Sequence, residues 1–289
     1  MHPFDYAKPT SLAEARTLLA QTAADGVVLA GGSDVLRRIE EEVIRPQVLI
    51  DIKGLPELRG ISFSVHGGLS LGATTTISAL AAHNDVRRHY SLLVKASHQL
   101  GSLRIRNRAT VGGNICVALP QTDLPPALLC YDATCHLLGP EGERTVPLSE
   151  CYKGTRQTAL EPGELLVRVT LPAPAAYSYG AYHTVRQGGQ TTVVGAAVLA
   201  RRASGPSTEW RIALAAAAPY PLRAYEAETH LASAEPGAAM VEKAAELAMR
   251  AAQPADDIRA SARYRRSMVG VLVRRGIEEV IEQLSGRGR

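Results

Sequence analysis

Two pairs of adjacent glycines, each beside a residue with a hydroxyl group, are the part of this sequence best suited to binding chemistry. The first pair, Gly31 and Gly32, follows the apolar run 27–30. Ser33 and Asp34 come directly after it. Because glycine has no Cβ, its backbone N–H groups can approach a bulky anion, and a neighbouring hydroxyl can add a hydrogen bond. The spacing matches neither G-x-G-x-x-G nor the P-loop, so a Rossmann or Walker site is excluded.

The second pair, Gly112 and Gly113, stands between Thr110 and Asn114. The hydroxyl and the amide of these flanking residues could bond the same anion that the glycine backbone approaches. Either loop alone could be an ordinary turn that uses glycine for positive φ. Two such loops, each next to an apolar run, indicate one phosphate-rich ligand held from two sides.

Composition excludes several classes of protein. The 289 residues are 46% hydrophobic and 21% charged, as in ordinary soluble proteins, and allow two or three small domains. With a net charge of +4, two Phe and one Trp, the chain lacks the basic stripe and stacking platform of nucleic-acid binders. No apolar run approaches the length of a membrane span, and no signal peptide is recognisable at the N-terminus. We therefore expect a cytoplasmic protein.

The cysteines Cys116, Cys130, Cys135 and Cys151 form no C-x-x-C pair and fit no zinc or iron–sulfur spacing. We expect them to be reduced and partly buried. No Ser-His-Asp or metal-ligand constellation emerges either.

Local patterns predict an α+β fold in three parts. In residues 1–55, a capping box at 11–14 begins a helix to Ala20, and a short helix begins near Val35, after the first glycine pair. Residues 56–172 mix helices and strands, and residues 177–285 carry antiparallel strands followed by packed helices. The predicted strands are 27–30, 48–52, 69–73, 135–138, 144–146, 164–171, 179–185, 191–200 and 211–217, and the main helices before the C-terminal part are 77–84 and 91–100.

Several motifs together resemble a known family. They are AGGSDVL at 30–36, LGATT at 71–75, IRNRATVGGNI at 105–115, DLPP at 123–126, PGELL at 162–166 and DIRASARYRR at 257–266. In this order they resemble the FAD-binding (medium) subunit of molybdenum hydroxylases, a group with xanthine, nicotinate, quinoline, aldehyde and carbon monoxide dehydrogenases. The resemblance covers nearly the whole chain.

The resemblance implies a two-part PCMH-type FAD-binding domain, residues 1–55 and 56–172, followed by a C-terminal domain at 177–285. It implies a large molybdopterin subunit and a small subunit with [2Fe–2S] clusters as partners, as a dimer of heterotrimers. FAD would pass electrons to NAD⁺ or another acceptor, and no catalytic acid or base is needed because the cofactor performs the chemistry. The implied cofactor-binding residues are Leu29, Ala30, Gly31, Gly32, Ser33, Asp34, Val35, Leu100, Thr110, Gly112, Gly113, Asn114, Asp123, Leu165, Leu166 and His183.

Some of these residues have a second interpretation. Asp123 matches an acid that contacts the sugar portion of the flavin nucleotide, and it could also cap the helix after it. Leu165 or Leu166 matches a residue that touches the flavin, and either could be a core leucine. His183 stands where the family commonly has lysine; the histidine keeps a hydrogen-bond donor but loses a fixed charge at neutral pH.

Two further patterns bear on partners and substrate. Three alternating arginines, Arg104, Arg106 and Arg108, predict either a strand with one solvated face or cations that face FAD phosphates or the iron–sulfur subunit. The Gly-Gly-Ser-Asp loop favours a xanthine or N-heterocycle type, since carbon monoxide dehydrogenases usually have Gly-Gly-His-Ser. Alternatives are a carbon monoxide or aldehyde type, a free-standing FAD oxidoreductase, and a docking subunit without flavin.

Overall fold

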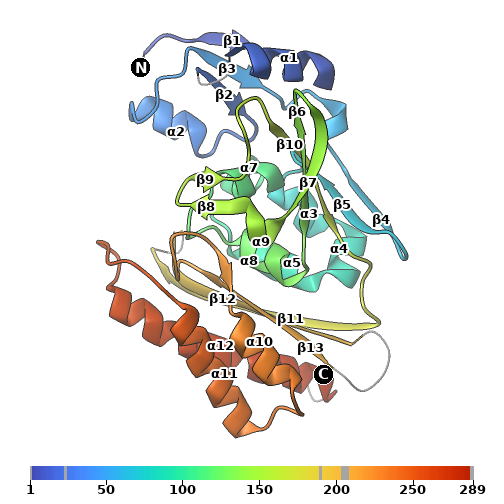
Figure 1. Cartoon of the computed structure of the whole chain (residues 1–289), viewed down its shortest axis with the longest axis vertical. Helices are drawn as coiled ribbons and strands as arrows, with labels where there is room; N and C mark the ends of the chain where they lie inside the picture. Colours follow the sequence, from blue (N-terminus) through green and yellow to red (C-terminus); the bar gives the residue numbers. More distant parts are fainter. Residues whose placement is uncertain (1, 23–24, 189–190, 203–207, 287–289) are drawn as a thin grey trace.

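The computed structural model describes residues 2–22, 25–188, 191–202 and 208–286. Within these residues, three larger sheets follow one another along the long axis of the molecule, and a fourth sheet is a small two-stranded hairpin (Figure 1). The first two of the larger sheets come from residues 5–171, and the third with its helices forms the C-terminal part. The molecule therefore has mixed α and β structure, as the sequence predicted.

The first part is a three-stranded parallel sheet with the order β1-β3-β2. Its first helix begins where predicted, because the Ser11 hydroxyl accepts a hydrogen bond from the Glu14 N–H at 3.2 Å. The Glu14 carboxylate in turn accepts from the Thr10 N–H at 2.6 Å. The elements are β1 (Asp5–Ala7), α1 (Leu12–Thr22), β2 (Gly26–Leu29), α2 (Val35–Glu40) and β3 (Val48–Asp51).

The middle part is a five-stranded antiparallel sheet with the order β4-β5-β10-β6-β7, with helices packed beside it. The strands predicted at 135–138 and 144–146 lie in β6 and β7, which pair as a hairpin with its turn between Gly139 and Gly142. The strands are β4 (Ile61–Ser64), β5 (Gly68–Gly72), β6 (Thr134–Gly139), β7 (Gly142–Pro147) and β10 (Leu165–Leu171), with a small hairpin of β8 (Tyr152–Gly154) and β9 (Gln157–Thr158). The helices are η1 (Pro56–Leu58), α3 (Ile77–Ala82), α4 (Asn84–His89), α5 (Ser91–Gln99), α6 (Leu103–Arg106), α7 (Val111–Cys116), α8 (Leu124–Cys130) and α9 (Leu148–Cys151).

The third part is a four-stranded antiparallel sheet with helices on both faces (Figure 1). Alternate residues of its central strand enter two different cores: Leu199 packs with α5 and α8, and Val198 packs with the C-terminal helices. Burial on both faces explains why this strand is a continuous apolar run in the sequence. The elements are β11 (Tyr177–Gln187), β12 (Thr191–Arg202), β13 (Glu209–Ala215), β14 (Leu222–Arg223), α10 (Tyr225–Ala232), α11 (Ala238–Ala251) and α12 (Ala262–Leu284).

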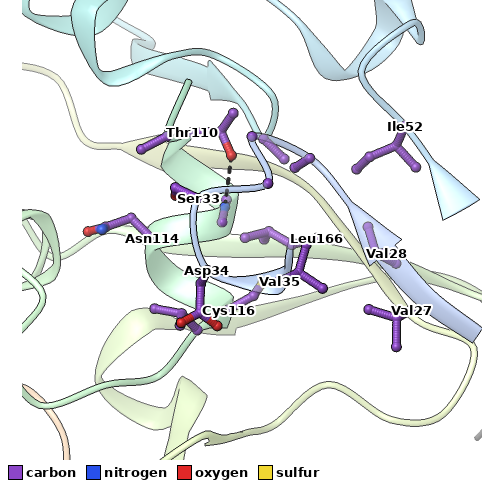
Figure 2. Close-up of a pocket in the computed structure, with 18 of the residues that line it drawn as sticks. Val27, Val28, Ser33, Asp34, Val35, Ile52, Thr110, Asn114, Cys116 and Leu166 are labelled. Carbon is purple, nitrogen blue, oxygen red and sulfur yellow. Dashed lines mark hydrogen bonds between the residues drawn. The ribbon is translucent and has the colours of Figure 1, made fainter. Parts of the chain in front are cut away.

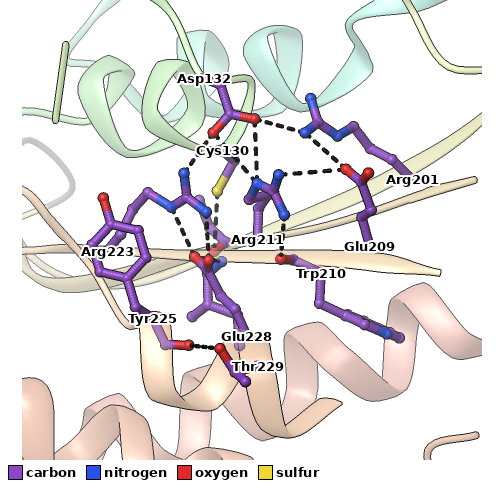
Figure 3. Close-up of polar contacts among 12 residues, drawn as sticks. Cys130, Asp132, Arg201, Glu209, Trp210, Arg211, Arg223, Tyr225, Glu228 and Thr229 are labelled. Atoms are coloured by element: carbon purple, nitrogen blue, oxygen red, sulfur yellow. Dashed lines mark hydrogen bonds and ion pairs between the residues drawn. The ribbon is translucent and has the colours of Figure 1, made fainter. Parts of the chain in front are cut away.

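An ionic network connects the middle part to the third sheet (Figure 3). Asp132, directly after α8, accepts from Arg201 at 2.6 Å, Arg223 at 2.5 Å and Arg211 at 3.3 Å. Glu228 pairs with Arg223 on the other side. Burial alone would raise the pKa of Asp132, but the three arginines hold that pKa below its ordinary value. The network therefore fixes the C-terminal sheet against the middle part.

Two local predictions need correction. The alternating arginines do not form a strand: residues 103–106 are helix α6, which begins because the Ser102 hydroxyl accepts from the Ile105 N–H at 3.4 Å. The second glycine pair is not a loop, since Gly112 and Gly113 lie in the first turn of α7. A period of two over six residues was too short to distinguish a strand from a capped helical turn.

Among the described helices, none combines the length and apolar character that crossing a membrane requires.

Candidate cofactor site

A cavity of about 510 Å³ lies between the N-terminal unit and the middle part, within the size range of cofactor pockets (Figure 2). Most of the predicted site residues line it, although they come from elements far apart in the sequence. Those residues are Ala30, Gly31, Gly32, Ser33, Asp34, Val35, Leu100, Thr110, Gly112, Gly113, Asn114, Leu165 and Leu166.

The two glycine-bearing segments meet directly at this cavity. A Cβ built on Gly31 would lie 2.0 Å from the carbonyl oxygen of Arg108 and 3.1 Å from the Cα of Ala109. Only glycine therefore allows the two backbones to come this close. Gly32 has a φ of +80°, so it also needs the conformational freedom of glycine.

The second segment is held by hydrogen bonds that orient the start of α7. The Thr110 hydroxyl accepts from the Gly113 N–H at 3.1 Å and so caps the helix (Figure 2). The Gly112 N–H donates to the carbonyl of Ala73 at 2.9 Å, and a Cβ on Gly112 would lie 2.8 Å from the Ala73 Cβ. Glycine is needed at position 112 because its backbone packs closely against Ala73, and not because of a positive φ.

Two buried polar atoms at the cavity lack a hydrogen-bond partner among the described residues. One is the acceptor Oδ1 of Asn114, and the other is the donor Nε of Arg38. Buried polar atoms are normally paired, so both atoms indicate that a ligand supplies partners. One acceptor and one cationic donor fit a dinucleotide, which offers both N–H or O–H donors and diphosphate oxygens.

An ion pair crosses the cavity wall. Arg156, in the turn between β8 and β9, donates to the two carboxylate oxygens of Asp34 at 2.9 and 3.1 Å. Burial acts to raise the pKa of Asp34, but Arg156 and the nearby Arg38 and Arg37 lower it below its ordinary value. Asp34 is therefore ionised at neutral pH and holds the β8–β9 hairpin to the first glycine loop.

The rest of the wall is mainly apolar. Leu165 and Leu166 of β10 line the cavity, are 5% and 3% exposed, and each belongs to a hydrophobic core. Both are thus core leucines, and their contact with the flavin stays a prediction. Cys116 of α7 also faces the cavity, and burial, with a smaller effect of Cys151, raises the pKa of its thiol to about 12. This thiol is therefore neutral at physiological pH.

Three predicted residues do not line the cavity. Leu29 is buried in the core of the N-terminal unit. Asp123 does not cap α8 through its side chain; the carboxylate accepts from the Thr192 hydroxyl at 2.6 Å and from Arg186 at 3.2 Å. Burial raises the pKa of Asp123, and Thr192 and Arg186 oppose that rise. Asp123 thus connects α8 to the C-terminal sheet.

His183 also lies away from the cavity, on β11. Its Nε2 atom is 2.9 Å from Oε2 of Glu279, and its ring packs over Gly276, where a Cβ would lie 3.7 Å from the His183 Cδ2 atom. The other oxygen of Glu279 accepts from Lys95 of α5 at 2.7 Å. His183 thus belongs to a contact between α5, β11 and α12.

The sequence reasoning missed the two arginines that line the cavity. Arg38 stands four positions after Asp34, so the helical spacing on α2 could have revealed it. Arg156 belongs to no recognisable motif, and its φ of +60° becomes evident only in the folded hairpin.

Comparison with known proteins decides the family. Residues 2–174 match the family described as FAD binding domain in molybdopterin dehydrogenase, and residues 180–280 match the CO dehydrogenase flavoprotein C-terminal domain. The chain is an FAD-binding subunit of the molybdenum hydroxylase family. It is thus an oxidoreductase subunit, and FAD is its cofactor.

Individual relatives cover almost the whole chain. The carbon monoxide dehydrogenase medium chain of Hydrogenophaga pseudoflava is 34% identical over 281 residues, 95% of this chain and 96% of that protein. The xanthine dehydrogenase FAD-binding subunit of Escherichia coli O157:H7 is 31% identical over 290 residues, 98% and 99% of the two chains.

Solved structures support the same family assignment. A chain of the Cu,Mo-CO dehydrogenase has a TM-score of 0.92 at 32% identity, covering 97% of this chain and 98% of its own length. A chain of quinoline 2-oxidoreductase from Pseudomonas putida 86 has a TM-score of 0.90 at 30% identity, with 98% and 99% covered. The chain therefore shares a two-part FAD domain and a C-terminal domain with this family.

Proposed function

We propose that this flavin subunit receives electrons from the [2Fe–2S] clusters of a small subunit and delivers them to NAD⁺ or another acceptor. A large molybdopterin subunit oxidises the substrate, in a cytoplasmic dimer of heterotrimers. Bound FAD supplies the ability to accept electrons singly and to release them in pairs. The observation that supports this role most is the cavity in which both glycine segments meet beside the unpartnered atoms of Asn114 and Arg38.

Within this proposal, each group at the cavity has a defined task. The backbone around Gly31 and Gly32 binds the diphosphate, and Arg38 adds positive charge. The segment around Gly113, whose N–H groups are bonded within the protein, forms the opposite wall. Asn114 accepts a hydrogen bond from the cofactor, while the leucines of β10 and Leu100 exclude water. We assign Asp123 and His183 to the contact between the FAD-binding part and the C-terminal part.

We propose a xanthine or another N-heterocycle as the substrate of the complex. The Gly-Gly-Ser-Asp loop supports this choice, and relatives include subunits of xanthine, nicotinate and caffeine dehydrogenases. The competing assignment is a carbon monoxide or aldehyde type, since carbon monoxide and glyceraldehyde dehydrogenase medium chains are also similar. A free-standing oxidoreductase is the other alternative, and near-complete coverage of subunit chains argues against it.

The test is steady-state turnover of the complex purified after co-expression with its cognate small and large subunits. We expect reduction of NAD⁺ or an artificial acceptor with xanthine or another N-heterocycle, and much slower turnover with carbon monoxide or glyceraldehyde. Faster turnover with either of the latter would overturn the substrate assignment. If the isolated chain reduced its flavin with NADH and bound neither subunit, the free-standing alternative would be correct.

A further inference from the structure

Three exposed apolar side chains belong to the two segments that meet at the cavity. Leu103 and Ile105 of α6 are 61% and 41% exposed, and Leu36 of α2 is 41% exposed. Ile105 also lines the cavity, and the Leu36 side chain lies beside Gly32, 2.9 Å from where a Cβ on that glycine would be. The exposed apolar surface is thus continuous with the wall of the cofactor cavity.

The same short segment carries two arginines with no internal role. Within the described ranges, the exposed side chains of Arg104 and Arg108 make no hydrogen bond and no ion pair. Arg106, between them, donates to the carbonyls of Leu100 at 3.1 Å and Gly101 at 2.9 Å. One arginine therefore fixes the segment, and the other two present positive charge to the outside.

The segment is rigid enough to present these groups in one arrangement. The Ser102 hydroxyl caps α6, Arg106 binds the carbonyls at the end of α5, and the carbonyl of Arg108 lies against Gly31. None of the four residues of α6 is buried, although Leu103 and Ile105 are large and apolar. A preorganised apolar patch with a basic rim is the usual character of a protein interface rather than of a solvated helix.

We propose that Leu103, Arg104 and Arg108 form the docking surface for the small [2Fe–2S] subunit, through an acidic patch with an apolar centre on that subunit. This inference rests on the proposed function. Electrons must enter close to the flavin, and this surface borders the cavity through Ile105. The uncompensated arginines select a partner of opposite charge and accelerate encounter.

The test measures binding of the purified small subunit, with its clusters, to the full-length FAD-loaded chain by surface plasmon resonance. Leu103→Asp and Arg104→Glu should each raise the Kd about tenfold or more, because both groups would be buried in the complex. Matched controls are Val65→Asp, whose side chain is 64% exposed in the β4–β5 turn, and Arg87→Glu on the surface of α4. The controls should change the Kd less than about twofold, and bound FAD per chain should equal wild type in all four variants.

The salt dependence of binding and the binding of other partners provide further tests of the docking surface. Affinity of the wild-type chain should fall with added salt, and the dependence should be weaker for Arg104→Glu. If wild type binds the small subunit and Leu103→Asp and Arg104→Glu bind it as the controls do, the docking surface is wrong while the proposed function stands. The docking surface is also wrong if Leu103→Asp and Arg104→Glu keep small-subunit binding and lose binding of the large subunit or self-association of the chain. If wild type binds no small subunit at all, the proposed function falls as well.

Discussion

Gly31→Ala should weaken FAD binding more than the addition of a single methyl group at any other position in the N-terminal unit. The added Cβ would be 2.0 Å from the carbonyl oxygen of Arg108, whereas ordinary contact begins near 3.4 Å. The atoms in conflict belong to the backbone, so no side chain can rotate away. The two segments must therefore separate by about 1.4 Å, the difference between those two distances.

A separation of that size has two consequences of different magnitude. Overpacking of a close backbone contact should lower the free energy of unfolding by about 1–3 kcal/mol. A displacement beyond about 1 Å also moves N–H donors out of hydrogen-bond range of a bound diphosphate. The loss of two such bonds, at about 1.5 kcal/mol each, corresponds to roughly a hundredfold increase in the Kd for FAD.

The assay is titration of the flavin-free chain with FAD, followed by quenching of flavin fluorescence, with circular dichroism as the check on folding. Gly54→Ala is the matched control, since its new Cβ would meet only the Cε atom of Lys8, near the end of a flexible side chain, at 3.8 Å. This control should bind FAD as wild type does. A folded Gly31→Ala chain with a Kd within about twofold of wild type would refute the argument that the close approach of the two segments forms the site.

Three other changes test neighbouring parts of the structure. Asn114→Ala should raise the Kd for FAD about tenfold by calorimetry, through one lost hydrogen bond, and leave the melting temperature of the flavin-free chain unchanged. Asp132→Asn should lower the free energy of unfolding by about 2–3 kcal/mol at neutral pH, as urea titrations would measure. The pKa of Asp132 in the folded chain lies below its ordinary value of 3.8. The difference in unfolding free energy between wild type and variant should therefore be complete above pH 3.8 and disappear as the pH falls through the pKa of the folded state. Cys116, with a thiol pKa of about 12, should resist iodoacetamide up to about pH 9 in the folded chain and react after unfolding, as mass spectrometry would show.

Elements with strong local patterns could be predicted from the sequence. The strand predicted at 164–171 is β10 (Leu165–Leu171), and the helix predicted at 91–100 is α5 (Ser91–Gln99). Their apolar periodicity is long enough to identify the element without tertiary information. The two glycine-bearing segments could also be predicted to line one cavity, because two glycine pairs in one chain favour a shared ligand, although the second pair lies in a helical turn and not in a loop.

Long-range pairing explains what could not be predicted. Asp123 is paired with Arg186 and Thr192, 63 and 69 positions later, and no local pattern reveals such partners. Arg156 reaches Asp34 across 122 positions for the same reason. The strand alternative for residues 103–106 was wrong because a helix cap at Ser102 outweighs a short alternating pattern.

The most direct test of the central claim is an experimental structure of the chain with bound FAD. The account predicts one FAD in the cavity between Gly31 and Gly113, with the Asn114 Oδ1 atom and the Arg38 side chain bonded to it. An FAD molecule bound elsewhere, or bound in this cavity while Asn114 and Arg38 stay unpaired, would contradict it.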